Sequence, residues 1–239
     1  MRAVAVIPTR LASTRLPRKA LRPIAGRPMI QHVYEAVRRS PLLSDVIVAT
    51  DSAEIYDFCR AQDMHTLMTS EQCRSGTDRV QEAAAKLAAD VFVNVQGDEP
   101  LTRPEHIAAL LGTMQDGVQV GTLKTPISRE TAQDPNVVKV VTSPAGRALY
   151  FSRLPVPFDR DGGSAKYYKH LGFYAYRRGT LEQFVRWPES ELERSERLEQ
   201  LRFLENGVEI YVGLTPFDTV GVDTEEDLKR AEEIIGNGR

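Results

Sequence analysis

The amino-acid sequence predicts an α/β fold with a mostly parallel central sheet, and two observations lead to this prediction. Short apolar segments alternate with segments of helical periodicity through the first half of the chain. The apolar segments, such as 4–7 and 46–49, lack the polar alternation of a half-exposed strand, so we expect helices on both faces of the sheet. The alternation of strands and helices favours parallel strands with right-handed crossovers.

The individual elements of the first half follow from local patterns. Apolar side chains at Met29, Ile30, Val33 and Val37 lie near helical spacing. The segment 50–52, Thr-Asp-Ser, is a typical helix start. We therefore expect strands at 3–7, 46–49 and 91–95, and helices at 29–39, 52–61 and 75–89.

The pattern changes after about residue 120, where prolines and glycines interrupt the chain. We expect strands at 137–141, 148–152, 168–176 and 209–212, and helices at 178–186, at 191–206 and from about 224. No repeat or linker is evident, so 1–239 is interpreted as one domain with an inserted β-rich portion at about 124–177. This portion is aromatic, with Tyr150, Phe151, Phe158, Tyr167 and Tyr168. Such enrichment is typical of a buried contact, so we expect a dimer interface here.

Composition limits the class of protein. The formal net charge is −2, so the chain has no overall basic excess that would indicate a nucleic-acid partner. No apolar run approaches the roughly 20 residues that span a bilayer. The chain has only two cysteines, so we do not expect a disulfide framework. The simplest interpretation of Cys59 is a thiol that packs in the core. We expect a cytoplasmic protein with no membrane and no nucleic-acid partner.

Local charge is concentrated near the start of the chain, where the first 34 residues contain no acidic residue. The apolar segment 4–7 leads directly into a loop that is rich in Arg, Lys, Ser and Thr. Guanidinium groups match phosphate oxygens, and ligands of α/β sheets bind beyond the carboxyl ends of the strands, so the loop is typical of a polyphosphate site. The alternative is a solvated basic loop, which could contact RNA. The glycine-rich phosphate motifs G-x-x-x-x-G-K-[ST] and G-x-G-x-x-G are absent.

Two aspartates are candidates for metal binding. Asp98 follows the apolar segment 91–95, and Asp223 follows a short apolar step before the last helix. Mg²⁺ uses few protein oxygens and shares the remaining positions with phosphates and water. The alternatives are local: Asp98 could initiate a turn, and Asp223 or Thr224 could cap the helix.

Two further segments have both a functional and a local interpretation. The segment 74–79 begins a helix with small polar residues that could approach a base or a phosphate, or Ser75 could simply cap the helix with Asp78. The segment 192–202 contains many charged residues, and these could simply form ion pairs on the protein surface. Examples of such pairs are Glu193 with Arg197 and Glu199 with Arg202.

Eight fragments in order resemble the 3-deoxy-manno-octulosonate cytidylyltransferase (CMP-Kdo synthetase) family. They are P-x-R-x-x-S-T-R-L-P-x-K, A-T-D, S-G-T-D-R, V-Q-G-D-E-P, L-Y-F-S-R, H-L-G-x-Y-x-Y-R, L-E-Q-L-R and G-V-D-T-x-E-D-L, and they extend over 7–228. The resemblance implies a nucleotidyltransferase-type three-layer α/β/α fold, Mg²⁺ dependence, a homodimer, and a role in lipopolysaccharide biosynthesis.

The resemblance also implies roles for individual residues. Nucleotide binding would involve Arg10, Ser13, Arg15, Lys19, Arg74, Ser75, Gly76, Thr77 and Gln96. The metal ligands would be Asp98 and Asp223, and the catalytic groups Lys19, Arg10, Arg15 and Asp98. The sugar acid would be bound by Arg153, His170, Tyr174, Glu199 and Gln200. The sequence departs from the family pattern at Arg18 and Ala20, usually Gly and Pro, at Arg74, and at Phe158, where Trp is common.

The implied reaction joins CTP to Kdo and gives CMP-Kdo and pyrophosphate. Two alternatives stay open: activation of another 2-keto sugar acid, such as 8-amino-Kdo or a sialic acid, and a non-catalytic nucleotide-binding sensor.

Overall fold

The computed structural model describes residues 1–13 and 15–237, so Thr14 of the basic loop lies outside it. The chain forms two compact units: unit 1 is Met1–Ala108 with Thr219–Arg239, and unit 2 is Ala109–Asp218. The chain thus leaves unit 1, builds unit 2, and returns. The interpretation of 1–239 as one domain stays a prediction.

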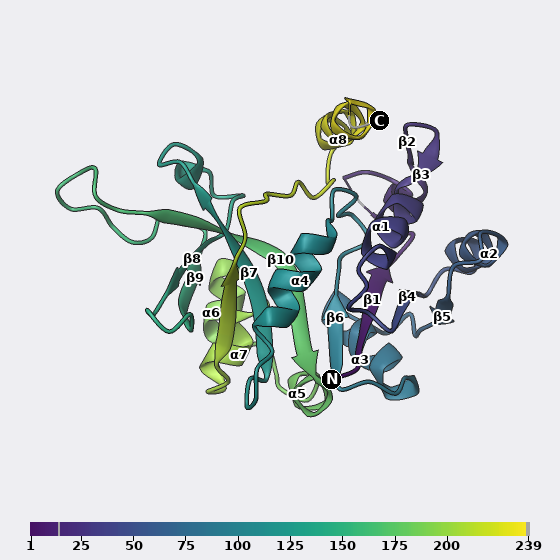
Figure 1. Ribbon diagram of the computed structural model, residues 1–239, viewed down its shortest axis with the longest axis horizontal. Helices are drawn as coiled ribbons and strands as arrows, with labels where there is room; N and C mark the ends of the chain where they lie inside the picture. The colour runs from purple at the N-terminus through teal and green to yellow at the C-terminus, as the bar shows by residue number, and fades with distance from the viewer. Residues whose placement is uncertain (14, 238–239) are drawn as a thin grey trace. The chain divides into compact units, whose positions relative to one another are not determined.

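Unit 1 contains a parallel sheet in the order β6-β1-β4-β5 (Figure 1). Its strands are β1 (Ala3–Thr9), β4 (Asp45–Thr50), β5 (Thr66–Met68) and β6 (Val91–Asn94). All seven residues of β1 are buried, so both faces of this strand are covered, as its unbroken apolar sequence predicts. The parallel order brings the carboxyl ends of all four strands to one edge, where a ligand site is expected.

The helices of unit 1 follow the predicted pattern with small shifts at their ends. They are α1 (Met29–Arg38), α2 (Ala53–Ala61), α3 (Gly76–Lys86) and α8 (Glu225–Asn237), and α4 (Pro104–Gly112) carries the chain toward unit 2. Helix α3 ends before 89 because Leu87 is already extended. The short β2 (Pro23–Ile24) and β3 (Arg27–Pro28) form a hairpin that contacts α8, and the 3₁₀-helix η1 is Lys19–Leu21. Sequence patterns missed the hairpin, β5 and α4.

Unit 2 is β-rich, as expected for the second half of the chain. Its strands are β7 (Val120–Ile127), β8 (Lys139–Thr142), β9 (Ala148–Ser152), β10 (Tyr167–Arg177) and β11 (Ile210–Leu214). Strand β7 lies between β10, which is antiparallel to it, and β11, which is parallel (Figure 1). Strand β8 pairs with β9 and, at one position, with β10. Strand β7 was not predicted, because Gly121, Lys124 and Pro126 obscure its pattern.

The helices of unit 2 correct two predictions. The expected single helix at 191–206 is wrong: α6 (Glu191–Glu196) and α7 (Leu201–Glu205) are separate, and Arg197 between them has a left-handed φ of 54°. The expected surface pair of Glu193 with Arg197 is also wrong, because the Glu193 carboxylate accepts from Arg202 across the break. The remaining helices are α5 (Arg178–Phe184) and the 3₁₀-helix η2 (Thr131–Gln133).

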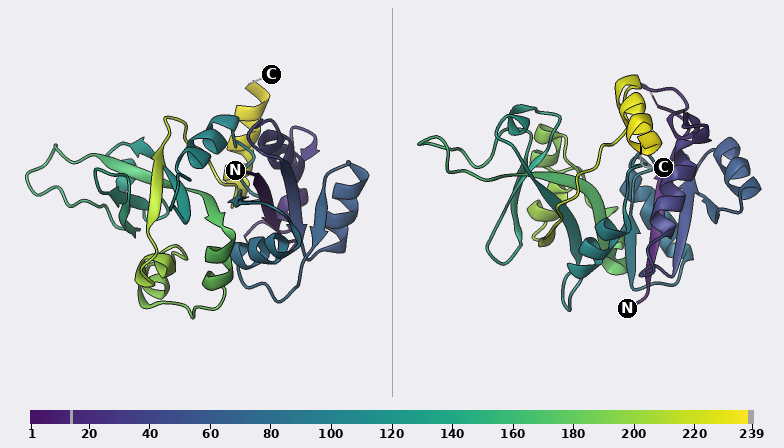
Figure 2. Two further views of the ribbon diagram at one scale, coloured as in Figure 1. Left: turned by 60° about the horizontal axis from the view of Figure 1, so that its bottom comes forward. Right: turned by 45° about the horizontal axis from the view of Figure 1, so that its top comes forward.

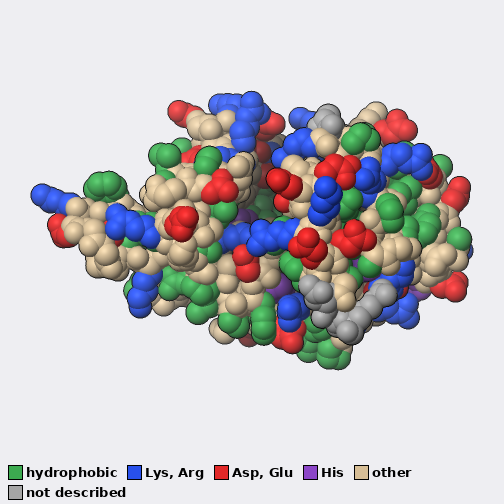
Figure 3. All heavy atoms as spheres, turned by 90° about the horizontal axis from the view of Figure 1, so that it is seen from above, with side chains coloured by type: hydrophobic (Ala, Val, Ile, Leu, Met, Phe, Trp, Pro, Cys, Tyr) green, Lys and Arg blue, Asp and Glu red, His purple; other side chains and the backbone are tan. Residues whose placement is uncertain are grey.

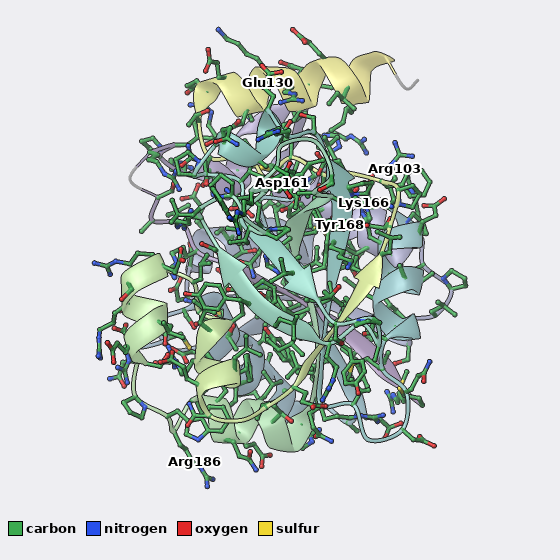
Figure 4. All side chains as sticks on the ribbon, turned by 90° about the vertical axis from the view of Figure 1, so that its left-hand side faces the viewer. Arg103, Glu130, Asp161, Lys166, Tyr168 and Arg186 are labelled. Atoms are coloured by element: carbon green, nitrogen blue, oxygen red, sulfur yellow. The ribbon has the colours of Figure 1, made fainter. Side chains whose placement is uncertain are left out.

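The segment 153–166 between β9 and β10 projects from the rest of unit 2 (Figure 2). Figure 4 looks from the side toward which it extends and labels Asp161 and Lys166 on it. Hydrophobic side chains lie at the surface of this segment, at the far left of Figure 3. Phe158 is 86% exposed there, whereas Phe151 and Tyr167 belong to the core of unit 2.

Two further expectations concerned Cys59 and membrane-spanning segments. Cys59 is a buried free thiol, which confirms its interpretation as a core residue. Among the described residues, no helix has the length and apolar character needed to cross a bilayer.

Candidate active site

A cavity of about 340 Å³ opens at the carboxyl-terminal edge of the sheet in unit 1. It contains most of the residues that the resemblance assigned to nucleotide and metal: Arg10, Ser13, Arg15, Lys19, Gly76, Gln96, Asp98 and Asp223. Pro8, Thr9, Ala12, Ala20, Arg79 and Gly97 complete the lining. Segments from both ends of the sequence therefore meet where parallel strands are expected to place a ligand.

Backbone contacts hold the segments of this site together. The amide of Val222 donates to the carbonyl of Asp98 over 2.9 Å, so Asp223 is brought beside the end of β6. The hydroxyl of Thr219 donates to the buried carboxylate of Glu99 over 2.6 Å and reinforces the same junction. At Gly97 a Cβ atom would collide with the Thr9 side chain, so this close approach of two strand ends requires glycine.

The charged centre of the cavity is the ammonium of Lys19. Its Nζ lies 2.5 Å from Asp98 Oδ2 and 2.9 Å from Asp223 Oδ1. The prediction that the two aspartates lie close together is confirmed, since both contact one nitrogen atom. Arg15 Nη2 also contacts Asp223, at 2.8 Å. Burial lowers the pKa of Lys19, but the two carboxylates outweigh burial and raise it above its usual value, so the group is cationic at neutral pH.

The alternative role of Asp223 or Thr224, as the cap of helix α8, is decided by the hydrogen bonds at the start of that helix. The Thr224 hydroxyl accepts from the Asp227 amide, and Asp227 Oδ2 accepts from the amides of Asp223 and Thr224. Thr224 and Asp227 therefore provide the helix cap. The Asp223 carboxylate is directed to Lys19 and Arg15 instead.

The start of α3 forms another part of the cavity wall. Ser75 and Asp78 form a capping box, in which the Ser75 hydroxyl accepts from the Asp78 amide over 3.1 Å. Gly76 lies flush against Gln96, because a Cβ at Gly76 would come within 3.2 Å of that amide. Of the described residues of this segment, Gly76 and Arg79 line the cavity, while Arg74, Ser75 and Thr77 do not.

Arg79 was missed by sequence reasoning. Its side chain is 2% exposed, and its guanidinium is held by Asp51 and by the Thr69 hydroxyl. The available signal was its position one turn after Gly76 on a predicted helix, within the fragment S-G-T-D-R.

The residues predicted for the sugar acid lie in unit 2. His170 and Tyr174 are both on β10, with ring centroids 5.4 Å apart. The Tyr174 hydroxyl and the Gln200 side-chain nitrogen are buried without a hydrogen-bond partner among the described residues. Burial raises the pKa of Tyr174 well above its usual value, so the hydroxyl stays protonated. Buried polar groups without a partner are uncommon in folded proteins, so these two positions need an explanation.

Arg153 and Glu199 differ from expectation in their surroundings. The Arg153 guanidinium donates to the carbonyls of Glu196, Pro135 and Arg197, at 2.7, 3.1 and 3.4 Å. It therefore ties the end of β9 to the break between α6 and α7. Glu199 and Gln200 lie in that break, so they are not successive positions inside one helix.

Comparison with known proteins identifies the family and the fold of the chain. Residues 4–210 match the family model described as "Cytidylyltransferase". The chain is 65% identical, over 98% of its length and 90% of the relative's, to a 3-deoxy-manno-octulosonate cytidylyltransferase of Koribacter versatilis strain Ellin345. It is 52% identical to the protein of that name from Acidobacterium capsulatum, over 98% of the chain and 97% of the relative. A solved structure of CMP:2-keto-3-deoxy-manno-octonic acid synthetase complexed with CTP superimposes with a TM-score of 0.97 at 41% identity, covering 100% of both chains.

Proposed function

Because the chain belongs to the cytidylyltransferase family, we propose that it joins CTP to Kdo and produces CMP-Kdo and pyrophosphate. The observation that carries the proposal is the cavity itself, in which Lys19, Arg10 and Arg15 lie with two carboxylates at the edge of a parallel sheet. The fold neighbour complexed with CTP and the relatives named for the same reaction support it.

The chemistry requires one phosphorus–oxygen bond to form and one to break. The anomeric hydroxyl of the sugar acid attacks the α-phosphorus of CTP, the bond to the β-phosphate breaks, and the hydroxyl proton is released. Arg10, Arg15 and Lys19 bind the triphosphate and neutralise the charge that develops on the departing pyrophosphate. The main contribution of the protein is orientation of the two substrates together with this charge compensation.

A divalent cation fits the donor set of the cavity. The carboxylates of Asp98 and Asp223 lie next to each other. The described residues contain no larger cluster, with three or more Asp, Glu, His or Cys side chains, that could hold a metal by protein groups alone. Two carboxylates are a typical protein contribution to a Mg²⁺ site, with phosphate oxygens and water in the other positions. Bound there, Mg²⁺ would supply charge neutralisation at the phosphates.

The sugar acid is assigned to the group Arg153, His170, Tyr174, Glu199 and Gln200. Its support is the pair of buried, unsatisfied polar groups on Tyr174 and Gln200, which suit the hydroxyls of a sugar. Arg153 keeps donors beyond its three carbonyl contacts, because a guanidinium has five N–H groups. It can therefore serve as the carboxylate anchor while it holds the local fold.

The proposal includes a homodimer that has much of its interface in the β-rich portion at about 124–177. Large apolar side chains are exposed on this portion, with Phe158 at 86%, Leu154 at 70% and Leu149 at 61%. Such side chains are commonly covered by a partner when they cluster. Light scattering at micromolar concentration tests this, and a strictly monomeric protein would contradict it. The proposal also includes a cytoplasmic location, which two free cysteines favour.

The test of the proposed function is pyrophosphate release from CTP, Mg²⁺ and Kdo. We expect release with CTP to exceed release with ATP or GTP greatly, and Asp98→Asn and Asp223→Asn to lose most of it while the fold is retained. The exposed Asp57 provides the matched control, since Asp57→Asn makes the same change on α2. A panel of 2-keto sugar acids identifies the preferred acceptor. Nucleotide binding without any pyrophosphate release would indicate a sensor.

A further inference from the structure

The lining of the cavity in unit 1 contains two chemically different groups of residues. Lys19, Asp98 and Asp223 form a charged group that suits a triphosphate and a cation. Pro8, Gly76 and Gln96 form a second, uncharged group, in which Gly76 lies against the other two side chains. Arg79 follows Gly76 on α3 and is also part of the cavity wall.

Arg79 is held in one orientation by two neighbouring strands. Its Nη2 donates to Asp51 Oδ2 over 2.5 Å, and its Nη1 donates to the hydroxyl of Thr69. Asp51 directly follows β4, and Thr69 directly follows β5. Because the side chain is 2% exposed and anchored at both terminal nitrogens, it enters the cavity wall as a rigid group.

A rigid guanidinium recognises a particular pattern of acceptors. Arginine has five N–H donors and no acceptor, and Asp51 and Thr69 engage two of the donors. Cytosine offers two adjacent acceptors on its ring edge, O2 and N3. Uracil has the same O2 but carries a proton on N3, so a second donor would face a donor. A site built to hydrogen-bond one group strongly rejects an analogue that cannot complete the bond.

We infer that Arg79 is a specificity-determining residue that reads the O2 and N3 edge of cytosine, and that Asp51 and Thr69 are positioning residues for it. This inference rests on the proposed function, because it assumes that a cytidine nucleotide occupies the cavity. It adds a way to discriminate cytosine from uracil that depends on anchors from two other strands.

The test measures dissociation constants of CTP and UTP by calorimetry on the full chain, without sugar acid. The double variant Asp51→Asn with Arg79→Gln removes both members of the ion pair, so no unpaired charge is left buried. We expect its preference for CTP over UTP to fall at least tenfold, because a glutamine amide can present either a donor or an acceptor. Thr69→Val keeps the guanidinium and loses one anchor, and should reduce the preference roughly threefold. The double variant Asp57→Asn with Arg60→Gln makes the same two substitutions at exposed positions of α2 and should leave both constants unchanged.

The outcomes separate this inference from the proposed function. A wild-type preference for CTP that both variants retain would overturn the role of Arg79, as would an equal loss of affinity for the two nucleotides. If the double variant does not fold, Thr69→Val decides, and an unchanged preference then refutes the inference. Pyrophosphate release by the wild-type protein with CTP and Kdo reports on the proposed function independently of these ratios.

Discussion

Replacing Lys19 by methionine tests the charged centre of the cavity most directly. In the nucleotide-free protein the ammonium lies between Asp98 and Asp223, at 2.5 and 2.9 Å. Lys19→Met keeps most of the side-chain volume but removes the cation that the two carboxylates share, and only the contact of Arg15 with Asp223 remains. Two effects follow, one on stability and one on metal binding.

The magnitude of the stability effect follows from the exposure of the three groups. Removal of one partner from a fully buried ion pair costs about 3–5 kcal/mol. Here the Lys19 side chain is 17% exposed, but those of Asp98 and Asp223 are 28% and 44% exposed, so water screens part of the repulsion. We therefore expect Lys19→Met to lower the free energy of unfolding by about 1–3 kcal/mol, between the values for buried and surface pairs.

The effect on metal binding has the opposite sign. In the wild-type protein a divalent cation has to displace the ammonium before it can bind both carboxylates, whereas in Lys19→Met it does not. We expect the variant to bind Mn²⁺ or Mg²⁺ more tightly than the wild type without nucleotide, although its turnover with CTP is lost. Urea unfolding and calorimetric metal titration measure the two effects. Unchanged stability together with unchanged or weaker metal binding would refute this reasoning.

Three further predictions concern other residues. Arg18 has a left-handed φ of 57°, which glycine adopts at no steric cost. Arg18→Gly should therefore raise the free energy of unfolding, measured by urea unfolding, by about 0.5–1 kcal/mol, although it removes the exposed ion pair with Glu54. Burial, with a smaller effect of the Lys169 charge, lowers the pKa of His170 from 6.5 to about 3. The neutral side chain of His170 therefore makes its full contribution to the free energy of unfolding above pH 6.5. As the pH falls from 6.5 toward 3, the free energy of unfolding should decrease by up to about 1.4 kcal/mol per pH unit. In His170→Gln, this pH dependence should be absent from the urea midpoints measured over the same range. Tyr174→Phe removes a buried hydroxyl that has no hydrogen-bond partner among the described residues, so it should stabilise the protein by about 1 kcal/mol. The kcat/KM for the sugar acid should fall, whereas the Kd of CTP should not change. A destabilised variant with a normal kcat/KM would contradict this prediction.

The basic part of the cavity could be predicted because its signals are local. Basic residues follow β1 directly, and Asp98 follows β6, so the position of strand ends sufficed to bring them together. The proximity of Asp98 and Asp223 was predicted from the family resemblance and from the apolar segments that both residues follow, whereas the backbone bond from Val222 to Asp98 that fixes it has no sequence signature.

Other parts of the fold depend on contacts that a pattern does not reveal. The break at Arg197 uses a left-handed conformation without glycine or proline, so 191–206 has the sequence of one helix. It is accompanied by the buried pair of Glu193 with Arg202, whose spacing of nine residues fits no helical rule. Arg79 was missed for a similar reason, since the residues that hold its guanidinium, Asp51 and Thr69, follow two other strands.

The path of the chain through unit 1 has a consequence for synthesis of the protein. Asp98 belongs to Met1–Ala108, whereas Asp223 belongs to the segment that returns to unit 1 at Thr219. During translation, the ribosome must therefore complete all of Ala109–Asp218 before the second carboxylate exists. The charged centre is thus assembled late in translation, and incomplete chains lack one of its two carboxylates.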